Sequence, residues 1–428
     1  MPSRFLRFVV TLLTAGAAAL AADVALTKDT AGHWQLARDG RPFTVHGVGG
    51  WEQMQLAATI GVTTIRTWGA EDLSVVVDGK PMVDRAHELG LAVVAGLWVK
   101  HERQGINYDD PGQLQAQRER IRAEVRQYRN HPAIIVWGLG NEMEGPESPT
   151  GPERIWREVE ILARIVKEED PHRPVMTTIA GAAREKIEAV RQFCPSLDLL
   201  GLNLYGGAPA AVSQLDKGGW DRPFMLTEFG PLGPWEVRHT SWDAPIEPDT
   251  NAKVANYLRA YRAAMADPRG RCVGTFAFLW GQKQEATATW FGMFLPTGEK
   301  TPIVDAMGRE FTGRWPANRS PQIEPLRPVF ANEQVRPGAE YPVEVTATDP
   351  EHDALTYEWV VQAEATERKV GGDPETAPPV HPECIIRAEG SRAVLRMPVT
   401  PGAYRLFVYV RDGQGGGCSE NVAFNVQP

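Results

Sequence analysis

The sequence predicts a (β/α)8 barrel, an α/β fold, followed by a small all-β domain. Short apolar runs rich in β-branched residues recur eight times between residues 43 and 280, and segments with helical periodicity separate them. After a proline-rich stretch the pattern changes to closely spaced strand-like runs and turns, which predicts the second domain. A chain of 428 residues is long enough for both.

The N-terminus has the pattern of a secretory signal peptide. Arg4 and Arg7 precede an apolar run from Phe8 to Leu20, and Ala19-Leu20-Ala21 offers a cleavage site of small residues. The run is too short to span a bilayer. We therefore expect cleavage after Ala21 and a periplasmic or secreted protein; an uncleaved anchor is the alternative.

The predicted barrel strands are almost entirely apolar, as expected for strands that are covered on both faces. They are Phe43–Val48, Thr63–Trp68, Ala92–Val99, Ile134–Leu139, Val175–Ile179, Leu199–Tyr205, Phe224–Phe229 and Gly274–Trp280. Residues 23–42 predict a hairpin that covers the barrel floor.

Helical stripes fill the segments between the strands. Ile155, Val159, Leu162 and Val166 form one stripe. Val254, Leu258, Tyr261 and Met265 form another, on a helix that is predicted to be capped by Thr250. A doubly wound open sheet is the alternative fold. Its support, Gly138-Leu139-Gly140 after a strand, lacks the third glycine of a dinucleotide-binding fingerprint.

The C-terminal part divides into a linker and a predicted β-sandwich of immunoglobulin type. Pro316, Pro321, Pro325 and Pro328 mark the linker. We thus expect a signal peptide at 1–21, the barrel with its hairpin at 22–313, the linker at 314–328 and the sandwich at 329–428. The predicted sandwich strands are Glu340–Ala347, Leu355–Val361, Ala393–Met397, Arg405–Val410 and Asn421–Val426.

Composition and charge exclude several functions. The net charge of −9 indicates no basic face, so we expect no nucleic-acid partner. The nine histidines include no HxH or HExxH motif, and we expect neither a metal nor a cofactor. No further apolar run approaches membrane-spanning length, so we expect no integral membrane contact. Cys384 and Cys418 are candidates for a disulfide, whereas Cys194 and Cys272 are expected to stay thiols. The oligomeric state is left open.

Two glutamates are predicted at the same opening of the barrel. Catalytic groups of such barrels lie at the carboxyl ends of the strands. Glu142 follows the fourth strand, and Glu228 lies at the end of the seventh. Paired carboxylates across a cleft hydrolyse glycosides: one donates a proton to the leaving oxygen, and the other attacks the anomeric carbon. The alternative is that both are surface loop acids.

Other strand ends supply a candidate sugar-binding set. Arg66 is placed to keep Glu228 ionised, Tyr205 to hydrogen-bond it, and Asn141 to bind a sugar 2-hydroxyl. Tryptophans, of which the chain has 13, gather at the same rim and offer flat faces to pyranose rings. We expect Trp51, Trp235 and Trp242 there as well. The candidate substrate-binding residues are Arg66, Trp68, Trp98, His101, Asn141, Asn203, Tyr205 and Trp280.

The segment from Tyr128 to Glu142, YRNHPAIIVWGLGNE, closely resembles the acid/base signature of glycoside hydrolase family 2. Residues 223–230, PFMLTEFG, resemble the nucleophile strand of that family. The resemblance covers residues 40–312 and implies a retaining enzyme of clan A, with Glu142 as acid/base and Glu228 as nucleophile. It also implies supporting roles for Arg66, Asn141, Tyr205 and Trp280. Residues 347–359 resemble immunoglobulin-like and polycystic-kidney-disease-type repeats.

The sequence therefore predicts a retaining β-glycosidase that hydrolyses a β-linked oligo- or polysaccharide by double displacement. Members of the family usually carry two β-domains before the barrel, and a barrel without them is expected to have a more open groove. Retention predicts carboxyl groups about 5–5.5 Å apart. The alternatives are a transglycosylase on β-glucan-type substrates and a non-catalytic carbohydrate-binding protein.

Overall fold

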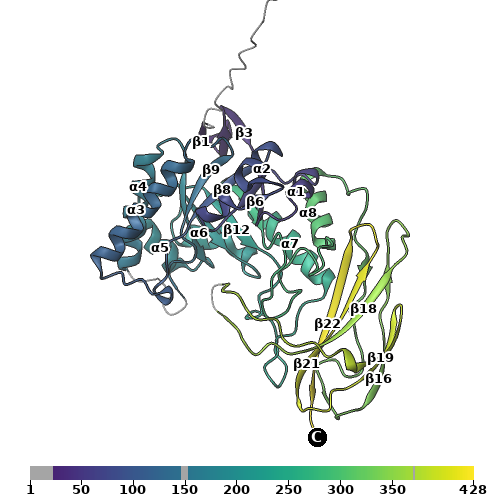
Figure 1. Ribbon diagram of the computed structural model, residues 1–428. Helices are drawn as coiled ribbons and strands as arrows, with labels where there is room; N and C mark the ends of the chain where they lie inside the picture. Colours follow the sequence, from purple (N-terminus) through teal and green to yellow (C-terminus); the bar gives the residue numbers. More distant parts are fainter. Residues whose placement is uncertain (1–22, 146–152, 370–371) are drawn as a thin grey trace, which may run out of the picture.

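The computed structural model describes residues 23–145, 153–369 and 372–428, in which a barrel packs against a β-sandwich (Figure 1). The predicted signal peptide, residues 1–21, lies outside the described residues. No described helix is long and apolar enough to cross a membrane.

The barrel is closed, with its strands in the order β10-β11-β12-β13-β4-β5-β8-β9 and every neighbouring pair parallel. This confirms the (β/α)8 prediction and excludes the doubly wound open sheet. The barrel strands are β4 (Val45–Gly49), β5 (Thr64–Arg66), β8 (Ala92–Leu97), β9 (Ile134–Leu139), β10 (Val175–Ala180), β11 (Leu199–Asn203), β12 (Phe224–Phe229) and β13 (Cys272–Ala277).

Helices surround the barrel and bury their apolar stripes against it. On the fourth of them, Ile155, Val159, Leu162 and Val166 are all buried, as their spacing predicts. The helices are α1 (Met54–Thr59), α2 (Met82–Glu88), α3 (Pro111–Tyr128), α4 (Glu153–Glu169), α5 (Arg184–Phe193), α6 (Ala211–Lys217), α7 (Thr250–Met265) and α8 (Pro302–Thr312). The connecting loops contain η1 (Ala70–Ser74), η2 (Glu102–Gln104), η3 (Ala208–Ala210) and the short ribbon of β6 (Val76–Val77) and β7 (Lys80–Pro81).

The predicted cap of α7 is wrong by one residue. Asp249, not Thr250, is the N-cap, and its carboxylate accepts a hydrogen bond from the backbone N–H of Ala252 at 2.8 Å. The Thr250 hydroxyl donates instead to the carbonyl oxygen of Ser419 in the sandwich, at 2.7 Å. A residue that looks like a cap in the sequence thus serves the contact between the two domains.

The floor of the barrel is covered by an antiparallel sheet of β1 (Val24–Lys28), β2 (Trp34–Arg38) and β3 (Arg41–Phe43). Val24 and Leu36 of this sheet share a buried cluster with Val45 and Ala92, the first residues of β4 and β8. The predicted hairpin is therefore confirmed, with a third strand. Because it closes the amino ends of the strands, the carboxyl ends remain for the site.

Two packed sheets form the C-terminal sandwich. Trp359, Leu406 and Phe424 of the larger sheet share one core with Val343 and Leu395 of the smaller sheet. The larger sheet is β15 (Gln334–Val335), β22 (Gly417–Val426), β21 (Gly402–Arg411) and β18 (Thr356–Ala363). The smaller is β16 (Glu340–Glu344), β20 (Arg392–Arg396) and β19 (Ile385–Glu389), and the remaining elements are β14 (Gln322–Ile323), β17 (Ala347–Thr348) and η4 (Pro382–Cys384). The immunoglobulin-type topology stays a prediction.

Buried polar contacts join the sandwich to the barrel. The Arg405 guanidinium pairs with Glu364 at 2.9 Å and donates to the Pro245 carbonyl oxygen, also at 2.9 Å. The backbone N–H of Thr250, at the start of α7, donates to the Glu420 carboxylate at 2.8 Å. Within the predicted linker, Ile323 is already buried in the sandwich core. The two domains therefore pack directly on each other.

All four cysteines are free thiols. The disulfide considered for Cys384 and Cys418 is therefore not formed, whereas Cys194 and Cys272 are thiols as expected. Cys384 lies on η4 and Cys418 on β22, and both side chains are buried in the sandwich core, where an apolar thiol packs well.

Candidate active site

Glu142 and Glu228 both lie at the open end of the barrel. The chain leaves β9 through a turn in which Gly140 and Glu142 have φ of 69° and 54°. The backbone N–H of Glu142 donates to the Thr178 carbonyl oxygen at 2.8 Å, which anchors this turn to β10. Left-handed backbone at a non-glycine residue is uncommon and tends to occur at functional sites.

An irregularity in β12 sets the orientation of Glu228. Leu202 of β11 is in register with Leu226, but the next residue, Asn203, is in register with Glu228. Thr227 is thus an extra residue in the ladder, as in a β-bulge, and bulges next to active sites redirect side chains. The Thr227 hydroxyl donates to the Asn203 side-chain oxygen at 2.8 Å and so ties the two strand ends together.

Three donors hold the carboxylate of Glu228. Arg66 Nη1 donates to its Oε1 at 2.8 Å, and the indole N–H of Trp68 donates to the same oxygen at 3.0 Å. The Tyr205 hydroxyl donates to Oε2 at 3.0 Å. Arg66 and Glu228 are only 3% and 6% exposed, so their ion pair is shielded from water and from salt.

A chain of hydrogen bonds connects the two glutamates. Arg66 Nη2 donates to the side-chain oxygen of Asn141 at 2.7 Å. The Asn203 amide donates to that same oxygen at 3.2 Å and to Glu142 Oε1 at 2.8 Å. Because the Asn141 oxygen already accepts from two donors, its amide nitrogen is the group left to bind a substrate. The two carboxylates are thus positioned by one shared network.

The electrostatics of the two glutamates differ. Burial and, second, the negative charge of Glu228 raise the pKa of Glu142 to about 7, whereas the hydrogen bond from Asn203 opposes the rise. Among the residues that the structure describes, no arginine forms an ion pair with Glu142, whereas Arg66 pairs with Glu228. One carboxyl group is therefore suited to hold a proton at neutral pH, and the other to remain a carboxylate.

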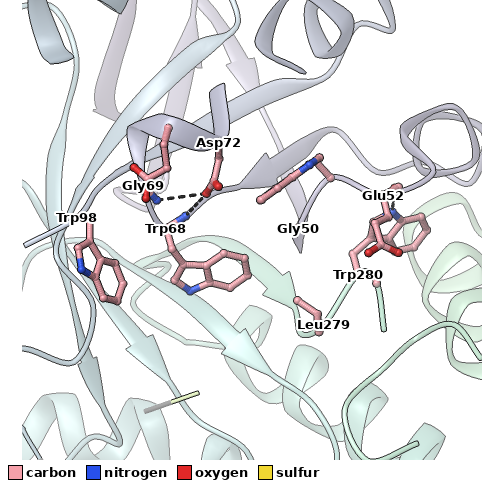
Figure 2. A pocket seen from close by; sticks show the side chains of 11 residues that line it. Gly50, Glu52, Trp68, Gly69, Asp72, Trp98, Leu279 and Trp280 are labelled. Atoms are coloured by element: carbon pink, nitrogen blue, oxygen red, sulfur yellow. Dashed lines mark hydrogen bonds between the residues drawn. The ribbon is translucent and has the colours of Figure 1, made fainter. Parts of the chain in front are cut away.

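A cavity of about 440 Å³ opens beside Glu228 (Figure 2). Of the predicted aromatic residues, Trp51, Trp68, Trp98 and Trp280 line it. Trp235 does not line it, but its ring lies 5.7 Å from that of Tyr205, which is bonded to Glu228, and 63% of its surface is exposed. Trp242 is not among the lining residues. Four of the six tryptophans that were expected at one rim thus line this cavity, and a fifth lies beside Tyr205.

His101 is buried next to these groups, with its ring 5.7 Å from that of Trp98. Burial, and then the charge of Arg103, lower the pKa of His101 to about 4. The ring is therefore neutral at pH 7 and suits a lining role. The described residues contain no cluster of histidine, cysteine, aspartate or glutamate that could hold a metal ion.

Several polar residues at the site escaped the sequence reasoning. Asp72 lines the cavity and accepts hydrogen bonds from the backbone N–H groups of Trp68 and Gly69 at 3.3 Å. Glu285, in the loop after β13, pairs with Lys283 at 2.7 Å, and its pKa is raised by burial and in part by the charge of Glu228. The sequence does contain a signal for Glu285. Residues 281–285 form a polar loop directly after the eighth strand, where barrel enzymes place site residues.

Comparison with known proteins finds one family model that matches part of the barrel. The model of the TIM barrel domain of the glycosyl hydrolases of family 2 matches residues 76–230, a span that includes both glutamates. This part of the chain is therefore similar to the barrels of that family.

Solved structures agree with this fold. A β-glucuronidase from Bacteroides uniformis has a TM-score of 0.52 at 15% identity, over 95% of this chain and 48% of its own. A β-glucuronidase from Bifidobacterium dentium, complexed with coumarin-3-O-glucuronide, has a TM-score of 0.51 at 16% identity, over 68% of this chain and 49% of its own. A β-D-glucuronidase from Dictyoglomus thermophilum has a TM-score of 0.50 at 16% identity, over 69% and 54%. This chain spans about half the length of the structures that it matches.

Proposed function

We propose that the protein is a retaining β-glycosidase that acts on a β-linked oligo- or polysaccharide, with Glu228 as nucleophile and Glu142 as general acid and base. The unequal environment of the two glutamates carries the proposal: Glu228 accepts three hydrogen bonds, one from an arginine, whereas burial raises the pKa of Glu142 to about 7. The family 2 match over both residues supports it.

In the first step, a carboxylate oxygen of Glu228 attacks the anomeric carbon of the sugar. The bond from that carbon to the glycosidic oxygen breaks, and protonated Glu142 donates its proton to the departing oxygen. The Asn141 amide nitrogen is free to bond the 2-hydroxyl, where contacts strengthen in the transition state. The product is a glycosyl ester on Glu228 and a free leaving group.

In the second step, Glu142 is a carboxylate and takes a proton from an incoming water molecule. The water oxygen attacks the anomeric carbon, and Glu228 leaves as a carboxylate. Asn203, which donates to Glu142 at 2.8 Å, stabilises the charge that Glu142 carries between the two steps. A sugar hydroxyl that enters in place of water would make the same chemistry a transglycosylation.

The apolar run before Ala21 supports secretion, so we propose that the enzyme meets its glycan in the periplasm or outside the cell. The relatives named above act on glucuronides according to their descriptions, but at 15–16% identity they support the class of reaction and not a particular sugar.

Azide rescue of two variants tests the roles. Glu228→Ala should lose turnover on all glycosides. Glu142→Ala should still form the intermediate from an aryl glycoside with a good leaving group and hydrolyse it slowly, since general acid–base help is worth roughly 10²–10⁴-fold. Azide needs no base, so it should release a β-glycosyl azide from Glu142→Ala and give the α-azide with Glu228→Ala. The reverse configurations would reverse the roles, and wild-type activity in both variants would place the site elsewhere.

A further inference from the structure

The cavity beside Glu228 has an aromatic floor and an acidic wall. Trp98, Trp68 and Trp280 are spread along it, and Asp72 lies over the Trp68 backbone to which it is bonded (Figure 2). The residues that line it are Gly50, Trp51, Glu52, Trp68, Gly69, Glu71, Asp72, Trp98, Leu279, Trp280 and Gly281. These residues follow the ends of β13, β4, β5 and β8, which are four neighbouring strands in the closed barrel.

The charged side chains that line this cavity are all acidic. Three of its lining residues, Glu52, Glu71 and Asp72, carry carboxyl groups, and in the described part of the chain no lysine or arginine lines it. None of the three forms a salt bridge with a described residue. At Gly69, an added Cβ would meet the carboxyl group of Glu71 at 2.3 Å, so the glycine lets that carboxyl group fold back over the cavity edge.

Three basic side chains near the cavity are already paired. Arg66 is bonded to Glu228 and Asn141, as described above. Lys283 pairs with Glu285 at 2.7 Å, and Arg103 lies 3.6 Å from Asp373 of the sandwich. A negatively charged sugar in the cavity would therefore meet carboxylates, and among the described residues no lysine or arginine lines the cavity to balance its charge.

Trp68 connects the cavity to Glu228. It lines the cavity and donates to the carboxylate of Glu228, so one wall of the cavity contacts the proposed nucleophile. Glu142 and Asn203, which are bonded to each other, are not among the lining residues. With Glu142 as the general acid, the leaving group departs on that side, and the cavity is the part of the site that remains for the sugar attached to Glu228.

We propose that this cavity selects a β-linked hexopyranose without negative charge and rejects the corresponding uronate. The proposal rests on the glycosidase function proposed above and specifies its substrate class. Tryptophan faces pack against the C–H face of the ring, and the carboxylates of Glu52, Glu71 and Asp72 accept hydrogen bonds from its hydroxyl groups. The carboxylate of a uronate would lie close to these carboxylates in a partly desolvated site. The repulsion between the like charges would weaken the binding of that substrate.

The test compares matched pairs of p-nitrophenyl glycosides on the wild-type protein: β-glucoside with β-glucuronide, and β-galactoside with β-galacturonide. The neutral member of the better pair should have a kcat/KM at least about 100-fold higher than its uronide. The triple variant Glu52→Gln/Glu71→Gln/Asp72→Asn should narrow that ratio by about tenfold or more, because it removes the like charges and keeps the shapes. Glu119→Gln, on the exposed face of α3, is the matched control and should leave the ratio unchanged.

The outcomes separate this inference from the proposed function. A uronide turned over as well as its neutral partner, or a ratio that the triple variant does not change, overturns the inference and leaves the glycosidase standing. If no glycoside is turned over, calorimetric binding of methyl β-glucoside and of methyl β-glucuronide decides: preference for the neutral compound supports the cavity inference while the glycosidase fails. Equal binding, or preference for the carboxylate, overturns the inference as well.

A second inference comes from contacts of the sandwich with the barrel mouth. A loop of the sandwich extends from β18 toward the barrel (Figure 1). The Gly372 carbonyl oxygen accepts from Lys283 Nζ at 2.7 Å, and the Glu375 carboxylate accepts from the backbone N–H of Ala286 at 2.8 Å. Asp373 lies 3.6 Å from Arg103. Residues 372–375 thus contact loops that follow two different barrel strands, β8 and β13.

These contacts support the turn that holds Glu285 close to Glu228. Ala286 has a φ of 59° and is 4% exposed. Left-handed backbone is unfavourable for alanine and persists only when its surroundings fix it, and Glu375 accepts the hydrogen bond of its backbone N–H. Lys283, bonded both to Glu285 and to Gly372, links the same turn to the sandwich a second time.

We infer that the C-terminal domain supports the loop after β13 next to the substrate site and that Glu375 is a positioning residue for this loop. Glu375→Ala should raise the KM of the active glycoside and the dissociation constant of isofagomine by roughly three- to tenfold, the effect of losing one charge-assisted hydrogen bond. Glu375→Gln keeps an oxygen acceptor for Ala286 and should restore most of the binding. Glu389→Ala, at an exposed position of the smaller sheet, is the control.

A merely structural role predicts a different result: a lower midpoint of thermal unfolding for Glu375→Ala with KM and inhibitor binding unchanged. That outcome, or an equal effect of Glu389→Ala, would overturn the inference. Because isofagomine binding needs no turnover, the measurement also decides the matter if the proposed glycosidase activity fails.

Discussion

The hydrogen bond from Asn203 to Glu142 makes it possible to change the pKa of the proposed general acid with one substitution. Asn203 donates to Glu142 Oε1 at 2.8 Å and opposes the rise of the Glu142 pKa that burial causes. Asn203→Ala removes a donor that favours the charged form, so the pKa of Glu142 rises further. Because the first step needs protonated Glu142, kcat/KM falls as pH increases through this pKa, and the variant should keep its activity to higher pH.

The size of the effect follows from the contact. A hydrogen bond to a charged group is worth about 1.5–3 kcal/mol net, and 1.36 kcal/mol corresponds to one pH unit. Water that enters the space left by the amide replaces part of the bond, which favours the lower end. The basic limb of the kcat/KM profile, expected near pH 7 in the wild-type protein, should therefore move upward by about one pH unit.

The assay is the pH profile of kcat/KM from pH 5 to 10 on a substrate with a poor leaving group, such as an alkyl β-glycoside. A dinitrophenyl glycoside is the internal control, since its leaving group needs little protonation and its basic limb should not depend on Asn203. A limb that stays in place, moves downward, or moves equally on both substrates would refute the assignment of Glu142 as the acid.

Three further predictions follow from other contacts. Glu228→Gln removes the like charge that helps to raise the Glu142 pKa, so the carbon-13 NMR titration of Glu142 should move to lower pH; an upward move would contradict the electrostatic account. Arg405→Met leaves Glu364 buried without its partner and should lower the free energy of unfolding in urea by about 3–5 kcal/mol, whereas Arg392→Met, at an exposed pair, should cost under about 1 kcal/mol; equal costs would refute the role of the domain contact. Thiol titration of the mature protein under denaturing, non-reducing conditions should find four thiols, and two would show that Cys384 and Cys418 do pair.

The barrel could be predicted from the sequence because its strands are continuous apolar runs. Ile134–Leu139 and Phe224–Phe229 are strands in the structure with the same bounds as predicted. Short strands such as Gln334–Val335 lack this signal, because two residues show no periodicity, and their pairing depends on tertiary contacts.

The core of the site was also predictable, because residues at the carboxyl ends of parallel strands converge. Arg66 and Tyr205 contact Glu228, as predicted, whereas Asn203, predicted only to bind substrate, contacts Glu142. The acidic wall of the cavity could not be predicted in this way. Asp72, which lines the cavity, lies on η1 in the turn after the strand and not at the strand end itself. Glu375 comes from a different domain, and no local pattern indicates that its loop reaches the barrel mouth.

The central claim, that Glu228 is a catalytic nucleophile, is tested most directly by trapping the covalent intermediate. A 2-deoxy-2-fluoro-β-glycosyl fluoride of the sugar that the enzyme accepts slows both steps, the second more severely, so the ester on the nucleophile accumulates. Mass spectrometry of the intact protein should show one fluoroglycosyl group per chain, and peptide mapping should place it on Glu228. Label on Glu142, or release of product with inverted configuration and no label at all, would contradict the account.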